Sequence, residues 1–184
     1  MKEWGIIGEE TNIFSEQTQK VIKYALIHHA DKDSPSLPEN PSDLDKIKHL
    51  FACFFRDMDK LANFKGRTNH YLSEEGKEEQ VKVNNLPHGE MGKIDPPDLL
   101  ENFVNHQPID VKKCSSYESY ILQHLAWIFN VNLDHVLGKI DESEAIKKYL
   151  NYFERQLGFE EYEIIFQATN SYFQERGIER SGAE

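Results

Sequence analysis

Two adjacent histidines, His28 and His29, close an apolar, helix-like run and begin the string HHADKD. Imidazole is a common metal ligand, but a histidine pair indicates a site only when partners exist elsewhere in the chain. At about 100° per residue, the apolar residues of this run gather on one stripe of a helix, and His29 falls at its centre with His28 at its edge. We therefore expect the His29 ring to face inward, as a hydrogen-bonded core residue or as a metal ligand.

Carboxylates border a second apolar stripe, which runs through residues 44–61 and includes the string FFRDMDKL. Asp57 and Asp59 lie beside this stripe, and an acid at the edge of a buried face needs a partner. One interpretation is a solvated acid or an ion pair with Lys60 or Arg56. The other is a hard divalent cation held between the imidazole of His29 and a carboxylate on the next helix.

Helical periodicity dominates the elements that must position these groups, and it predicts an all-α fold. Five long helices are expected, at residues 15–30, 44–64, 117–131, 143–157 and 161–176, with a brief one at 96–106. Ser42 with Asp45, and Ser115 with Glu118, have the spacing of capping boxes. The stretch 66–97 is charged, glycine-rich and weakly periodic, so we expect a long loop or flap there, with a short strand at residues 79–83.

The composition indicates one domain over residues 1–184. The formal net charge of −11 disfavours nucleic acid as a partner, and the scattered acids do not form the regular array of a nucleic-acid mimic. No apolar run approaches the roughly 20 residues of a membrane span, and the first residues lack a signal-peptide pattern. We expect a cytoplasmic protein with no membrane partner, in which Cys53 and Cys114 are buried or idle thiols.

The strings VIKYALIHHADKD and FFRDMDKLANF, followed by LAWIFNVN, resemble the HD superfamily of metal-dependent phosphohydrolases. Its patterns run roughly AI-x-x-H-N, R-D-A-D-K-L-D and W-I-F-D-x-N-F, and the resemblance covers nearly the whole chain. It implies a helical HD-domain-like bundle. It also implies that His29 is a metal ligand and that the acidic ligand is Asp59, with Asp57 as the alternative, for a divalent Mn, Fe or Mg ion.

The front of the family pattern is missing. Only 28 residues precede His29, and no His-Asp dipeptide, the pair that names the family, occurs in the chain. The resemblance thus implies the C-terminal part of an HD domain, truncated before the dyad. Two ligands hold a metal poorly, so we expect metal-dependent hydrolysis of a phosphate ester, such as a nucleotide, to be weak or absent in this chain alone. A dimer mate or an upstream fragment would have to supply the other ligands; alternatively, the chain is a non-catalytic remnant that binds a partner or a small phosphorylated ligand.

Other candidates favour plainer interpretations. His88 and Glu90 match the start of a deaminase signature, but no Pro-Cys-x-x-Cys follows, so a polar loop is expected. His124 stands on a strongly apolar helix and is expected to be a packed, hydrogen-bonded core residue. The aromatic residues at helical spacing are expected in the core; these are Tyr117, Tyr120, Tyr152 and Phe153.

Overall fold

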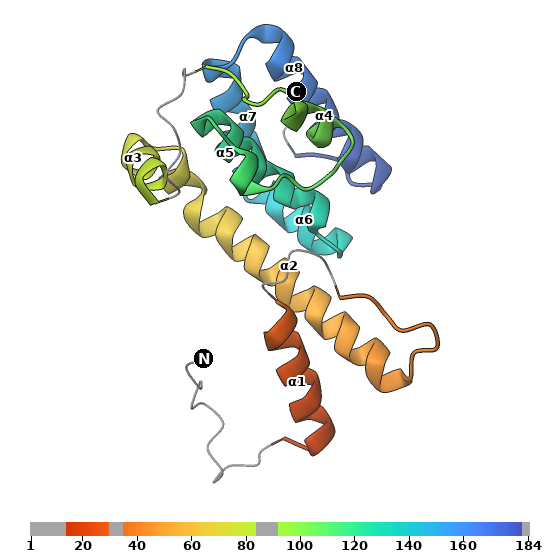
Figure 1. Ribbon diagram of the computed structural model, residues 1–184. Coiled ribbons are helices and arrows are strands. Elements are labelled where there is room, and N and C mark those ends of the chain that lie inside the picture. Colours follow the sequence, from red (N-terminus) through yellow and green to blue (C-terminus); the bar gives the residue numbers. More distant parts are fainter. Residues whose placement is uncertain (1–13, 30–34, 84–91, 182–184) are drawn as a thin grey trace. The chain divides into compact units, whose positions relative to one another are not determined.

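The computed structural model describes residues 14–29, 35–83 and 92–181, and the regular elements in these ranges are all helices (Figure 1). This confirms the all-α prediction. The chain divides into two compact units, Met1–Arg56 and Asp57–Glu184. Because helix α2 (Asp43–Tyr71) continues through the boundary, the single domain over residues 1–184 stays a prediction.

The first unit contains α1 (Glu16–His28) and the first half of α2. Ser15 caps α1 by accepting a hydrogen bond of 3.2 Å from the amide of Thr18. At the start of α2, the amide of Asp45 donates to Ser42 Oγ and the amide of Ser42 donates to the Asp45 carboxylate, both at 3.2 Å. This confirms the predicted capping box, which satisfies amides that have no partner inside the helix.

In this unit, the buried apolar side chains of α2 are small ones. Ala52 and Cys53 are 0% and 5% exposed. Four large side chains are instead exposed, at 46% for Ile47, 55% for Leu50, 42% for Phe51 and 44% for Phe54. We call these four residues the α2 face. The expectation that this stripe is buried is therefore wrong for these four residues.

The second unit is built around α5 (Tyr117–Leu125), in which all nine residues are buried. The other helices after α2 are α3 (Glu74–Val83), α4 (Asp98–Val104), α6 (Asp134–Glu142), α7 (Ala145–Gln156) and α8 (Phe159–Glu175), with 3-10 turns at Val111–Lys113 and Ala126–Asn130. Helix α7 contacts α5, α6 and α8, and α4 packs on α8 (Figure 1). Fully buried apolar side chains fill much of the interior of this unit, among them Leu122, Ile146 and Phe153 at 0% exposure.

The predicted loop at 66–97 is helical over most of its described part. Residues 66–71 continue α2, and α3 occupies residues 74–83, so the strand predicted at 79–83 is wrong. Ser73 explains the new helix start, because its Oγ accepts a hydrogen bond of 3.1 Å from the amide of Gly76. A Cβ on Gly76 would lie 1.9 Å from the carbonyl oxygen of His70, so only glycine allows α3 to approach the end of α2. A flap role for this segment stays a prediction.

Helix α5 begins one serine later than expected. Ser116, not Ser115, caps it, by accepting a hydrogen bond of 3.1 Å from the amide of Ser119. The Ser115 hydroxyl donates to the carbonyl oxygen and carboxylate of Asp95, at 2.8 and 2.7 Å.

Among the described residues, no helix has the length and apolar character needed to span a bilayer.

Candidate functional site

His29 ends the first helix and is exposed. It occupies the C-cap position of α1, and its Nδ1 lies 2.7 Å from the carbonyl oxygen of Leu26. A carbonyl only accepts, so Nδ1 is the donor in this contact. The inward orientation expected from the helical angles is wrong, because the apolar stripe of α1 is buried only at Val21 and Ala25.

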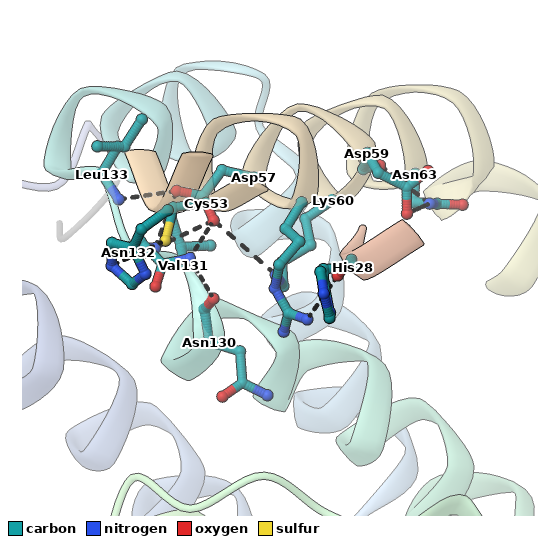
Figure 2. Close-up of polar contacts among 12 residues, drawn as sticks. His28, Cys53, Asp57, Asp59, Lys60, Asn63, Asn130, Val131, Asn132 and Leu133 are labelled. Atoms are coloured by element: carbon teal, nitrogen blue, oxygen red, sulfur yellow. Dashed lines mark hydrogen bonds and ion pairs between the residues drawn. The ribbon is translucent and has the colours of Figure 1, made fainter. Parts of the chain in front are cut away.

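Asp59 is also exposed, on the second half of α2. Asn63, one turn further along, donates from Nδ2 to the carbonyl oxygen of Asp59 at 2.9 Å and to its Oδ2 at 3.3 Å (Figure 2). These local contacts leave the carboxylate in solvent. His29 belongs to the first unit and Asp59 to the second, so their pairing around a metal stays a prediction.

Of the two candidate acids on α2, Asp57 is the buried one, at 0% exposure. Its carboxylate accepts four hydrogen bonds from the segment before α6 (Figure 2). The Asn132 amide donates to Oδ1 at 3.1 Å and to Oδ2 at 2.9 Å, the Asn132 Nδ2 donates to Oδ1 at 2.9 Å, and the Leu133 amide donates to Oδ2 at 2.8 Å. Lys60 Nζ lies 3.9 Å from Oδ1 and contributes positive charge.

This carboxylate anchors the segment before α6 from a distant part of the chain. Helix α6 begins at Asp134, and its N-cap residue, Leu133, has no side chain that can accept a hydrogen bond. The amides of Asn132 and Leu133 precede the first turn of α6, and Asp57 gives both of them an acceptor. Sequence reasoning placed Asp57 beside the apolar stripe but missed this partner, which is 75 residues away.

Arg176, at the end of α8, holds the same segment from its carbonyl side. It donates to the carbonyl oxygens of Val131 and Asn132 at 3.0 and 3.1 Å, and to the carboxylate of Asp134 at 2.6 Å. The segment 131–134 is thus fixed by an anion at its amides and a cation at its carbonyls. We call Asp57, Asn132, Leu133 and Arg176 the Asp57 cluster.

The Asp57 cluster does not fit a metal ion. Each carboxylate oxygen of Asp57 already accepts two hydrogen bonds. A coordinated cation would displace these donors and leave the amides of Asn132 and Leu133 without this acceptor. Within residues 14–29, 35–83 and 92–181, no three His, Cys, Asp or Glu side chains come together in a group that could hold a metal ion. Asp57 is therefore a structural residue in this fold.

His124 lies in the interior of the second unit, as predicted for a core histidine, at 4% exposure. Its ring centroid is 4.3 Å from that of Tyr71, 4.7 Å from that of Tyr120 and 4.4 Å from that of Trp127. Burial, and next the positive charge of Arg67, lowers the pKa of His124 to about 3. The neutral ring is thus a packing element and not a base for use near neutral pH.

The remaining sequence candidates are core residues or lie outside the described ranges. The aromatic side chains expected in the core are buried, namely Tyr117, Tyr120, Tyr152 and Phe153. Both cysteines are buried free thiols, and burial raises the pKa of Cys114 to about 12. His88 and Glu90 lie outside the described residues.

No protein-family model matches the chain, and searches of curated proteins and of solved structures found none similar to it.

Proposed function

We propose that this chain is a cytoplasmic, HD-like helical interaction module that does not hydrolyse phosphate esters by itself. The observation that carries the proposal is the α2 face, because large apolar side chains in solvent mark a surface made for a partner. The lack of hydrolysis is supported by Asp57, whose oxygens already accept hydrogen bonds within the fold. Only His29 and Asp59 then remain as predicted metal ligands, and a stable site needs more than two.

Dye binding tests the interaction half. An anilinonaphthalene sulfonate dye should fluoresce on the native chain at low protein concentration, and the L50E/F54E double variant should lose most of that signal. Circular dichroism checks that the helices remain. Native protein that binds no dye while folded would show that the α2 face is covered within the chain, which contradicts the proposal.

Metal content and turnover test the other half. Purified protein should carry far less than one equivalent of manganese, iron or magnesium, and p-nitrophenyl phosphate should not be hydrolysed above background with any of these ions added. Stoichiometric metal together with turnover that disappears in H29A and in D59A would refute this half and establish the chain as a phosphohydrolase.

A second candidate function is a metal-dependent phosphohydrolase assembled from two polypeptides. It is favoured by the exposure of both His29 and Asp59, whose side chains a further chain can approach. The test adds a helical fragment that carries a His-Asp pair, with manganese, and measures hydrolysis of nucleotides. Activity that needs both polypeptides and is lost in H29A would support this function, and no activity from the mixture would refute it.

A further inference from the structure

We propose that a groove between α4 and α8 binds a basic amphipathic helix of another protein. The groove has a volume of about 690 Å³, and its walls come from the end of α4 and the first three turns of α8. We call it the α4–α8 groove. It lies within the second unit, whereas the α2 face lies in the first, so this inference goes beyond the proposed function and uses a separate surface.

The two walls of the α4–α8 groove are held together before any partner arrives. Helix α4 packs on α8 (Figure 1), and Phe103 of α4 is 0% exposed. Just after α4, His106 Nε2 donates to the carbonyl oxygen of Ala168 at 3.2 Å, and its Nδ1 lies 3.3 Å from the carboxylate of Glu175. Ala168 itself lines the groove. A preformed groove loses little free energy to rearrangement when it binds a partner.

The apolar part of the groove carries large side chains in solvent. Val104 at the end of α4 is 47% exposed, and Phe159 and Ile164 of α8 are 77% and 41% exposed. Such side chains, gathered in one hollow, indicate a surface that a partner covers. Three exposed side chains offer a small area, so we expect a dissociation constant in the micromolar range.

The shape of the groove favours a helix as the ligand. An extended peptide binds best by adding to the edge of a sheet, and the regular elements of the described residues are helices. A helix satisfies its own backbone groups, and its ridge of side chains fits between two packed helices. The groove follows α8 over residues 160–171, a rise of about 17 Å, which matches about three turns of a bound helix.

The charge around the groove selects the kind of helix. Glu160 and Glu163 line it, and neither has an ion-pair partner among the residues that the structure describes. Helices α4 and α8 carry two and four acidic residues, respectively, and no lysine or arginine. A partner that buries the apolar side chains must therefore bring lysine or arginine to their borders.

The same charge argues against two other occupants. A second copy docked groove to groove would set the acidic residues of α4 and α8 against each other. An anionic membrane surface would be repelled by them as well. A helix with an apolar stripe and basic flanks complements both the floor and the rim of the groove.

A labelled synthetic peptide tests the inference by fluorescence anisotropy with the full chain. The peptide has about 14 residues, with leucine at three- and four-residue spacing and lysine elsewhere. We expect it to bind with a micromolar dissociation constant. That constant should rise at least about tenfold in E160K/E163K, which reverses the rim charge, and in F159S/I164S, which removes apolar contacts.

Two double and single variants elsewhere in the second unit are the matched controls. E75K/E78K makes the same charge change at exposed positions near the start of α3, and V83S removes an apolar side chain that is 70% exposed. Both should bind the peptide within about twofold of the wild type. A peptide with the same composition but no apolar stripe should bind at least about tenfold more weakly. Circular dichroism checks that each variant keeps its helices.

Three results would overturn the inference. The first is a wild-type chain that does not bind the peptide. The second is equal weakening in E160K/E163K and E75K/E78K, which would show attraction to the net charge of the chain and not to the groove. The third is a chain that self-associates and becomes monomeric in F159S/I164S, which would give the groove to a second copy. The dye that tests the α2 face is an anion, which the acidic groove disfavours, so the two proposals can fail separately.

Discussion

The buried carboxylate of Asp57 and the amide of Asn132 are joined across 75 residues of sequence by hydrogen bonds of 3.1 and 2.9 Å. The side chain of Asn132 adds a third bond, at 2.9 Å. This pairing connects the middle of α2 to the start of α6 inside the second unit. It explains why an acid is buried on α2: the carboxylate accepts hydrogen bonds from the backbone amides of Asn132 and Leu133.

Replacing Asp57 should destabilise the protein strongly. The D57A variant leaves the amides of Asn132 and Leu133 without an acceptor, and we expect a loss of about 3 kcal/mol in the free energy of unfolding. The D57N variant should also lose stability, since its NH2 group would face donors. Urea denaturation followed by circular dichroism measures both changes.

The matched control for this prediction is D59A, two residues along the same helix. Asp59 is exposed and contacts Asn63 only locally, so the change should stay within about 0.5 kcal/mol. Equal unfolding free energies for D57A and D59A would contradict the role of Asp57 in holding the segment before α6.

Arg176 should be coupled to Asp57 in stability, because both side chains hold the segment 131–134. We expect R176A to cost about 2 kcal/mol, since the carbonyls of Val131 and Asn132 lose their donor. The D57A/R176A double variant should lose less than the two single losses combined, as the second change acts on a segment already released. Urea denaturation of the four proteins gives this coupling. The exposed Arg155 supplies the control, and R155A combined with D57A should be additive.

Much of the helical framework follows from the sequence, whereas the long-range pairings do not. The three- and four-residue apolar periodicity predicted α1, α2, α5, α7 and α8, and Ser42 with Asp45 predicted the start of α2. The role of Asp57 depends on a segment far along the chain that periodicity does not place. One local signal was present, because Leu133, the residue directly before α6, has no side chain able to cap the helix.

Two failures have local physical causes. Helix α3 was missed because its charged, glycine-containing sequence lacks an apolar stripe, and Ser73 and Gly76 stabilise it by a cap and a close approach. The inward orientation predicted for His29 is wrong because the helical angles assume that every apolar residue of α1 is buried, whereas Leu26 is half exposed. The metal-ligand roles of His29 and Asp59 stay predictions.

Gly76 and Gly66 should respond to alanine in opposite directions. In G76A the new methyl group would lie 1.9 Å from the carbonyl oxygen of His70, which is backbone and cannot turn away, so α3 must shift. We expect a loss of about 2 kcal/mol. In G66A nothing lies within 4 Å of the methyl group and the site is inside α2, so stability should rise by about 0.5–1 kcal/mol. Thermal melts of both variants measure this, and a shift of the same sign in both would refute the close approach.

His124 should make the protein less stable as the pH falls. Burial and the charge of Arg67 lower its pKa from 6.5 to about 3 in the folded protein, whereas the unfolded chain keeps the ordinary value. Between these values only the unfolded chain binds the proton, so acid favours unfolding. The contribution of the neutral ring is complete above about pH 6.5 and declines below it, by up to about 1.4 kcal/mol per pH unit.

Comparison with H124L isolates this effect, because leucine is apolar and does not titrate. Urea denaturation at pH values from about 7 down to about 5 should show the wild type losing stability relative to H124L as the pH falls. H135L, at an exposed position of α6, is the matched control for replacing a histidine by leucine. A difference between wild type and H124L that stays constant over this range would mean that the ring is protonated equally in both states, against the burial that the fold imposes on it.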